Sequence, residues 1–196
     1  MILSKDIIKD DNPDLRRLSV PVSLPISSED RDTLISMYEY LVNGYDEEFV
    51  KKYKIRPGVG IAAPQIDVLK QMFAIVAFDE KGDDHQLLII NPKIVSTSEQ
   101  LAYLKGGEGC LSVDRECKGY IHRAARLTAK CHLLDPVTLE VKETTLRLKG
   151  YIAIIFQHEY DHLYGKLFYD HINKANPFYI PDNSSPIIFK GEDDDK

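Results

Sequence analysis

Residues 151–165 read YIAIIFQHEYDHLYG, a long stretch without proline that ends in Gly165. Such a stretch predicts a helix, and a terminal glycine is typical of a helix C-cap. His158 and His162 are four residues apart, so on a helix their imidazoles share one face and can hold one metal ion. Glu159 lies on the adjacent flank, where a carboxylate can reach a metal-bound water and transfer its protons. This stretch therefore predicts a late helix with a catalytic metal site.

An ordinary buried helix with two hydrogen-bonded histidines would also contain much of this pattern. The apolar residues Tyr151, Ile154 and Ile155 precede His158 and His162 on the same helical face. An apolar stripe that leads into two imidazoles is expected of a pocket for an apolar side chain that ends at a metal. A plain core helix has little reason to place two histidines and a glutamate in line with its apolar face. We therefore favour a metal site over an ordinary buried helix.

Two histidines leave a catalytic metal one protein ligand short, because such sites usually have three protein ligands and a water. One candidate for the third ligand is His171, nine residues after His162. The other is Cys110, which lies in the stretch GGEGCLS at residues 106–112. Its neighbouring glycines allow the backbone to come close to a ligand. The spacing of the residues leaves both candidates open.

The rest of the chain predicts a mixture of helices and strands. Residues 28–43 have apolar side chains at helical spacing, and Asp46 is expected to cap a second helical stretch. The last stretch, residues 175–196, contains three prolines and is expected to be irregular, with residues 187–189 docking back. Helices and short antiparallel strands around one late helix favour an α+β fold with a single domain over residues 1–196. The expected strands are residues 72–79, 87–92, 93–98, 126–135 and 143–150, the last two as a hairpin.

Composition excludes several classes of protein. The chain has 196 residues, of which 43% are hydrophobic, and no stretch approaches the roughly 20 apolar residues of a membrane span. Its three cysteines are an odd number, which fits a reducing cytoplasm better than a disulfide framework. The net charge is −6, and the acidic run GEDDDK at residues 191–196 is expected to be a solvated tail. We therefore expect a cytoplasmic protein that binds neither DNA nor membrane.

Three stretches occur in a specific order along the chain. They are GVGIAAPQ at residues 58–65, EGCLS at residues 108–112 and QHEYDH at residues 157–162. Together they resemble the three signature motifs of the peptide deformylases, which remove the N-formyl group from the starting methionine of new bacterial proteins. The resemblance covers residues 58 to about 170. The helical insertion before residue 58 is similar to the longer form of the enzyme from Gram-positive bacteria.

The resemblance implies a metal-dependent amidase that releases formate from N-formyl-methionyl peptides. Cys110, His158 and His162 would bind one divalent metal ion with water as the fourth ligand, and Glu159 would be the general acid and base. The family uses Fe²⁺ natively, and Zn²⁺, Ni²⁺ or Co²⁺ can occupy its site. Transient contact with the ribosome is the expected macromolecular interaction, and the basic run at residues 51–54 is a weak candidate for it.

The resemblance also assigns the residues that would bind substrate. The Gln65 side chain and the backbone N–H of Leu111 would stabilise the oxyanion, and Gly60 would pair through its backbone with the peptide. A neutral amide and a backbone N–H can hold that charge without competing for the metal. The positions that would line the site for the methionine residue are Val59, Glu108, Gly109, Tyr151, Ile154 and Ile155.

Two supporting contacts are expected near these residues. Either Arg123 or Arg126 is expected to pair with Glu108 and keep its carboxylate ionised. Asp161 is expected to accept a hydrogen bond that orients a neighbouring side chain.

Two other functions fit parts of the pattern. A peptidase of the wider His-Glu-x-x-His class would cleave internal peptide bonds and would not need a cysteine ligand from a Gly-Cys-Leu-Ser stretch. A structural metal-binding module would close the site with a fourth protein ligand, for which Cys117 is the candidate. The cysteine ligand and an open water position would distinguish the amidase from both alternatives.

Overall fold

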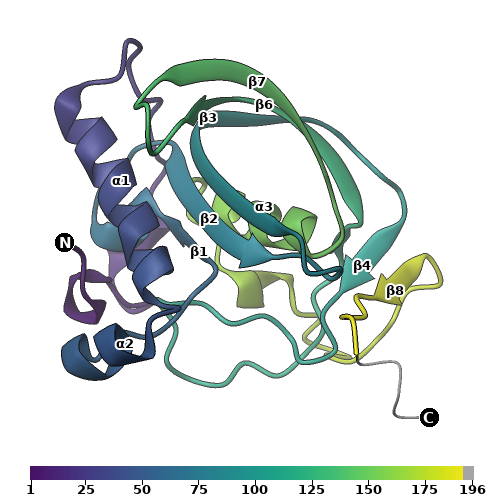
Figure 1. Cartoon of the computed structure of the whole chain (residues 1–196). Helices are drawn as coiled ribbons and strands as arrows, with labels where there is room; N and C mark the ends of the chain where they lie inside the picture. The colour runs from purple at the N-terminus through teal and green to yellow at the C-terminus, as the bar shows by residue number, and fades with distance from the viewer. Residues whose placement is uncertain (192–196) are drawn as a thin grey trace.

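Five antiparallel strands form the main sheet in the computed structural model, which describes residues 1–191 (Figure 1). Their order is β1-β2-β3-β6-β7, and the sheet curves around the helix α3 (Figure 1). This is the α+β arrangement of antiparallel strands around a late helix that the sequence predicts. The bounds are β1 Gly60–Ala62, β2 Met72–Phe78, β3 Asp84–Thr97, β6 Arg126–Leu134, β7 Val141–Lys149 and α3 Gly150–His162.

Strand β2 is buried on both faces because a helix covers each side of the sheet. Phe73 and Ile75 belong to the core that the sheet shares with α3. Ala74 and Val76 belong to the core shared with α1 (Ser28–Asn43). Successive side chains point to opposite faces of a strand, so the continuous apolar run of β2 supplies both cores. The two cores together hold α3 on the concave face of the sheet and α1 on the opposite face (Figure 1).

Two helices precede the sheet, and both begin at a capping side chain. The hydroxyl of Ser27 accepts a hydrogen bond from the backbone N–H of Asp30 at 3.1 Å at the start of α1. The carboxylate of Asp46 accepts two backbone N–H groups, at 2.9 and 3.1 Å, at the start of α2 (Glu47–Tyr53). Both predicted helices are confirmed. Short 3₁₀-helices are η1 Ser4–Asp6, η2 Pro13–Arg16, η3 Ala63–Ile66 and η4 Phe168–His171.

Strand β3 corrects one prediction, because residues 87–92 and 93–98 were expected to be separate strands and are one. The register with β6 shifts between Ile90 and Lys93, which marks a bulge rather than a turn. Asn91 has a φ of 50° at this point. Its side chain accepts the backbone N–H of Val22 and donates to the Val22 carbonyl, each at 2.8 Å. These two bonds hold the Asn-Pro pair inside the strand.

Helix α3 also ends earlier than expected, at His162 rather than near Gly165. Gly165 has a φ of +66°, and a Cβ there would lie 2.3 Å from the carbonyl oxygen of Arg16. Glycine is therefore required where the N-terminal segment crosses the end of the helix. The predicted C-cap glycine is present as a turn three residues beyond the helix.

The C-terminal stretch was expected to be irregular, but it contains a strand. β8 (Ser184–Pro186) pairs in parallel with β4 (Leu101–Tyr103), and β5 (Arg123–Ala124) completes a three-stranded sheet. One edge of β4 is available for this pairing. The three prolines of the C-terminal stretch predict irregular structure, so the sequence does not indicate the strand. Phe189 then packs its ring against Tyr151, with the two centroids 5.0 Å apart. The expected docking of residues 187–189 is thereby confirmed.

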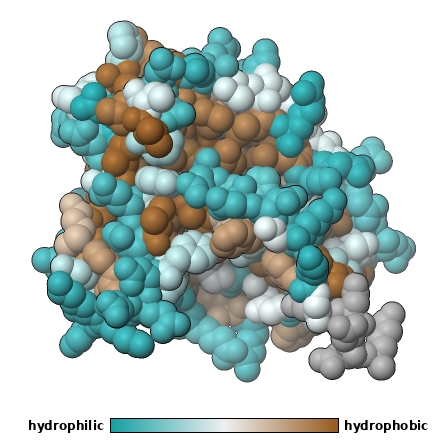
Figure 2. Space-filling model, in the orientation of Figure 1, coloured by the Kyte–Doolittle hydropathy of each residue, from teal (hydrophilic) through white to brown (hydrophobic). Residues whose placement is uncertain are grey.

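Figure 2 shows an apolar area over the upper strands of the sheet, beside α1, with hydrophilic residues around it. Within residues 1–191, no helix combines the length and the apolar character needed to cross a membrane. The predicted acidic tail begins at Gly191, and its residues 192–196 lie outside the described part of the chain.

Candidate active site

Three buried side chains bring together atoms that can bind a metal. The ligand atoms of Cys110, His158 and His162 all lie within 4.8 Å of one another. Both histidines come from α3, and Cys110 comes from the loop between β4 and β5. The Sγ of Cys110 is 3.4 Å from the Nε2 of His162. One sulfur and two imidazoles at this spacing form a donor set that fits a divalent transition-metal ion.

The electrostatic environment of Cys110 favours the form that binds metal. Burial alone would raise the pKa of its thiol, but the imidazoles of His162 and His158 hold the pKa well below its ordinary value. A thiolate is the form of cysteine that ligates metal. The Nδ1 of His162 is buried and has no hydrogen-bond partner among residues 1–191. The lowered pKa of Cys110 agrees with its place among the candidate metal ligands.

The other two candidate ligands lie outside this cluster. His171 instead places its Nε2 2.7 Å from the carboxylate of Asp161. Cys117 contacts the guanidinium of Arg115, with 2.5 Å between Nη1 and Sγ. The structure therefore brings Cys110, and neither of these residues, to the two histidines of the helix.

A buried carboxylate orients His158. The Nδ1 of His158 lies 2.8 Å from Oε2 of Glu108, and an ionised carboxylate only accepts hydrogen bonds, so the ring donates here. Its Nε2 is thereby left for the ligand cluster. Arg123 donates to both oxygens of Glu108, at 2.6 and 3.0 Å. Burial would raise the pKa of Glu108, but the charge of Arg123 and these hydrogen bonds lower it to about 2. The expected partner of Glu108 is thus Arg123.

The same guanidinium continues to a second carboxylate. Arg123 donates through Nη1 to Oδ2 of Asp161 at 2.9 Å, and that oxygen is also the partner of His171. Burial would raise the pKa of Asp161, but the bonds from His171 and Arg123 lower it to about 2. Asp161 thus accepts hydrogen bonds, as expected, and the neighbours that it orients are Arg123 and His171. A continuous chain of side-chain contacts runs from His171 through Asp161, Arg123 and Glu108 to His158.

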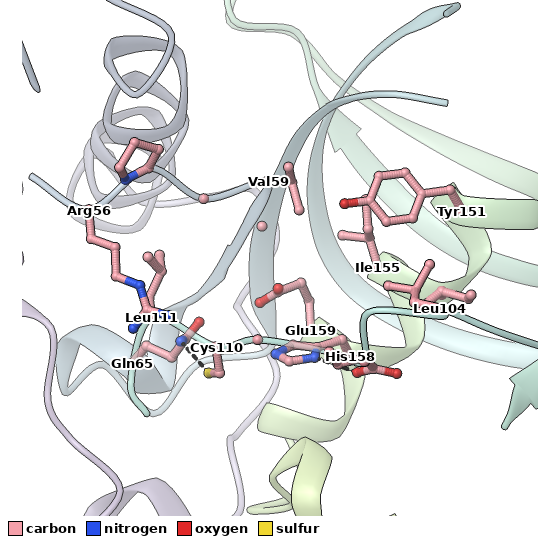
Figure 3. A pocket seen from close by; sticks show the side chains of 17 residues that line it. Arg56, Val59, Gln65, Leu104, Cys110, Leu111, Tyr151, Ile155, His158 and Glu159 are labelled. Carbon is pink, nitrogen blue, oxygen red and sulfur yellow. Dashed lines mark hydrogen bonds and ion pairs between the residues drawn. The ribbon is translucent and has the colours of Figure 1, made fainter. Parts of the chain in front are cut away.

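Glu159 projects into the cavity from the adjacent flank of the helix (Figure 3). The residue is 4% exposed, and its Oε2 has no hydrogen-bond partner among residues 1–191. Burial raises the pKa of this carboxyl to about 7. A carboxyl group with a pKa near neutrality can both take up and release a proton. Gly60 packs directly on it, since a Cβ at Gly60 would be 2.3 Å from Oε1.

Gln65 is held with its amide nitrogen toward the ligand cluster. Its Oε1 accepts the backbone N–H of Ala62 at 2.9 Å, which fixes the orientation of the amide. Its Nε2 lies 3.1 Å from the hydroxyl of Ser112 and 3.4 Å from the Sγ of Cys110. Leu111 is 7% exposed and lies beside Cys110 in the wall of the same cavity. Hydrogen-bond donors therefore stand next to the predicted metal position.

A cavity of about 310 Å³ opens beside this cluster (Figure 3). Glu108 lines the cavity, although its carboxylate is turned to Arg123 and His158. Arg56 and Leu104 also line it, and no sequence motif predicts either residue as part of the site. Leu104 follows a short strand and precedes Gly106 and Gly107, and nothing in a motif marks it as a wall residue. All the predicted substrate-binding residues contribute to the lining: Val59, Gly60, Glu108, Gly109, Tyr151, Ile154 and Ile155.

Known proteins match almost the whole chain. The family model described as polypeptide deformylase matches residues 4–178. Peptide deformylase 2 of Bacillus cereus is 50% identical over 187 residues, which are 95% of this chain and 99% of that protein. Peptide deformylase 2 of Geobacillus stearothermophilus is 51% identical with the same coverage. The crystal structure of peptide deformylase from Thermotoga maritima superposes with a TM-score of 0.63 at 29% identity, and covers 85% of this chain and 96% of that one.

Proposed function

The chain belongs to the polypeptide deformylase family, and on this premise we propose that Cys110, His158 and His162 hold the catalytic metal ion while Glu159 transfers protons. The enzyme is a hydrolase that removes the N-formyl group from nascent peptides. The observation that carries the proposed assignment is the convergence of one thiol and two imidazoles within 4.8 Å, beside the buried Glu159, whose Oε2 has no hydrogen-bond partner among residues 1–191.

Binding of substrate uses the edge of the main sheet. β1 pairs with β2 on one side and is the terminal strand of the sheet, so an extended peptide can add to its other side. Gly60 in β1 would pair through its backbone with the peptide. The methionine side chain would enter the apolar part of the cavity between Tyr151, Ile154 and Ile155. In this proposal, the formyl group would lie at the end of the cavity that contains Cys110 and His158.

The chemistry is hydrolysis of the formyl C–N bond. Cys110, His158 and His162 would hold a divalent ion, which would supply Lewis-acid chemistry at this site. Glu159 takes a proton from the attacking water and delivers it to the amine as the C–N bond breaks, so the products are formate and a free amino terminus. Its position on the flank of the helix beside His158, with Oε2 free of any hydrogen-bond partner among residues 1–191, suits both transfers. The Gln65 amide and the Leu111 N–H donate to the oxygen that becomes negative.

Several finer assignments follow from the family. We propose Fe²⁺ as the native ion, although one thiolate and two imidazoles also suit Zn²⁺, Ni²⁺ or Co²⁺. Anaerobic purification followed by elemental analysis tests this, and a stoichiometric content of another metal with full activity would contradict it. We further propose that the enzyme acts in the cytoplasm on N-formyl-methionyl chains and contacts the ribosome transiently. The exposed lysines at residues 51, 52 and 54 support that contact.

The assignment of Glu159 is tested with Glu159→Gln. This variant should keep its metal, and its formate release from formyl-Met-Ala-Ser should fall by about 10²- to 10⁴-fold, the usual contribution of a positioned acid or base. The Cys110→Ser variant should lose its metal. Cys117→Ser is the matched control, because Cys117 lies outside the ligand cluster, and it should keep both metal and activity. Wild-type turnover by Glu159→Gln, or full metal content in Cys110→Ser, would refute the assignment.

A further inference from the structure

We propose that the C-terminal segment, residues 184–190, sets the size of the methionine pocket by holding the ring of Tyr151, with Phe189 as the positioning residue. The inference rests on the proposed function, because it takes the cavity beside Cys110 as the site of the methionine side chain. It goes beyond that function by assigning substrate selectivity to a segment remote from the metal cluster. The family model ends at residue 178, so the segment also lies outside the matched region.

Tyr151 stands between two cavities. The first is the cavity of about 310 Å³ beside the metal cluster, and a second of about 260 Å³ lies next to it. Tyr151 and Leu104 line both. Figure 3 shows these two side chains next to each other, at the end of the first cavity farthest from Cys110. A rotation of the Tyr151 ring toward the second cavity would therefore lengthen the first.

The far wall of the second cavity comes from the C-terminal segment. Ile187 and Phe189 line it, whereas Ile188 does not, as expected for an extended chain whose side chains alternate. The ring of Phe189 meets that of Tyr151 edge to face, with the centroids 5.0 Å apart and the planes at 78°. This is the favoured geometry for an aromatic pair. Phe189 thus occupies the position from which it can hold the Tyr151 ring against the first cavity.

The backbone of Tyr151 is fixed by the same region. Its N–H donates to a carboxylate oxygen of Glu80 at 3.1 Å, and the Glu80 carbonyl accepts the N–H of Lys190 at the same distance. Gly150 has a φ of +59°, and a Cβ there would lie 2.2 Å from Glu80, so glycine is required at this contact. With the backbone held by Glu80, the freedom that remains to Tyr151 is rotation of its ring, and Phe189 opposes that rotation.

The segment itself is anchored away from the pocket. β8 pairs with β4, and the N–H of Ile187 continues this pairing to the carbonyl of Tyr103 at 2.8 Å. His122 contacts the segment through its Nδ1, which lies 2.7 Å from the Ser184 hydroxyl, and its Nε2 lies 2.8 Å from the carbonyl of Tyr179, which precedes the segment. These contacts give Phe189 a fixed base, so that removal of its ring changes the support of Tyr151 without releasing the segment.

The test compares Phe189→Ala with the wild type on formyl-Met-Ala-Ser and formyl-Phe-Ala-Ser. The ratio of the two kcat/KM values, methionine over phenylalanine, should fall by about tenfold, the smaller end of what a methylene-sized change in a pocket produces. Phe189→Tyr keeps a ring in place and should keep the ratio. Ile188→Ala is the matched control, since its side chain faces away from the second cavity, and it should also keep the ratio.

The outcomes separate the inference from the function on which it rests. A wild type without preference for methionine would refute the proposed pocket itself. A wild type that prefers methionine, together with an unchanged ratio in Phe189→Ala, would overturn the role of Phe189. A purely structural role lowers the melting temperature and slows both substrates equally, which leaves the ratio unchanged and counts against the inference. If Phe189→Ala does not fold, Phe189→Leu removes the aromatic ring with less loss of volume. The methionine-to-phenylalanine ratio of kcat/KM in that variant then tests the role of Phe189.

Discussion

Gly60 offers a direct test of how closely the geometry around Glu159 controls turnover. A methyl group at Gly60 would lie 2.3 Å from Oε1 of Glu159, 2.8 Å from its Cδ and 2.9 Å from its Cγ. Non-bonded heavy atoms need about 3.5 Å, so in Gly60→Ala the carboxylate must recede by about 1 Å. Glu159 is 4% exposed, which leaves it little room to recede without rotating away from the cavity. The substitution therefore displaces the proposed proton carrier without changing its chemistry.

The expected size of the effect follows from this displacement. A misplacement of about 1 Å in an active site can cost about 10²-fold in rate, which corresponds to about 2.7 kcal/mol in the activation free energy. We therefore expect Gly60→Ala to lower kcat for formyl-Met-Ala-Ser by about two orders of magnitude, measured as formate release. Metal content should stay at the wild-type level, because the three atoms nearest to the added methyl group all belong to Glu159 and not to a proposed ligand.

A second glycine provides the control. A Cβ at Gly106 would meet no atom within 4 Å, and its backbone is not in the left-handed region. Gly106→Ala should therefore keep kcat within about twofold. A Gly60→Ala enzyme that is folded and fully metallated, with a kcat close to that of the wild type, would refute the reasoning. A change confined to KM would instead assign Gly60 to peptide binding alone.

Two more substitutions test the charged groups around the site. Arg123→Lys keeps the charge but loses the two hydrogen bonds to Glu108, so His158 is less well oriented. Metal affinity, measured by competition with a chelator, should fall by about 10- to 100-fold. Unchanged affinity would contradict this role of Arg123. Asp170→Asn removes the carboxylate partner of Arg16. Burial would raise the pKa of Asp170, but the hydrogen bond from Arg16 lowers it. The ion pair therefore stabilises the fold above the unfolded pKa of about 3.9, and this stability is lost as pH falls through the folded pKa. The variant should melt below the wild type at pH 7 and approach it in acid, whereas a constant deficit would argue against the ion pair.

The parts of the fold that the sequence predicts correctly are those with local causes. The helix at residues 28–43 is defined by a capping serine and by apolar residues at helical spacing, and the structure has it over the same residues. The pairing of His158 with His162 follows from the geometry of any helix. In contrast, the strand break predicted near Asn91 fails because Val22, far away in the chain, satisfies the Asn91 side chain. Sequence patterns contain no record of such a partner.

The third metal ligand is another feature that local sequence does not determine. Spacing alone left Cys110 and His171 as alternatives, because each lies in a segment whose path is not set by the helix. In the structure, Nε2 of His171 lies 2.7 Å from the carboxylate of Asp161, whereas the Sγ of Cys110 lies 3.4 Å from Nε2 of His162. The choice between the candidates thus depends on tertiary contacts, and only the resemblance to a family made it from the sequence.

The network behind His158 explains why ligand identity is easier to predict than ligand orientation. Glu108 lines the pocket as expected, and its carboxylate, with a side chain only 4% exposed, is bound by Arg123 and His158. A buried carboxylate is tolerated only with such partners, and Arg123 in turn needs Asp161 to balance its remaining donor. Each member is an ordinary charged residue in the sequence, separated from the next by 15 to 50 positions. A helix can place two imidazoles on one face by itself, whereas directing Nε2 of His158 toward the metal requires the whole folded chain.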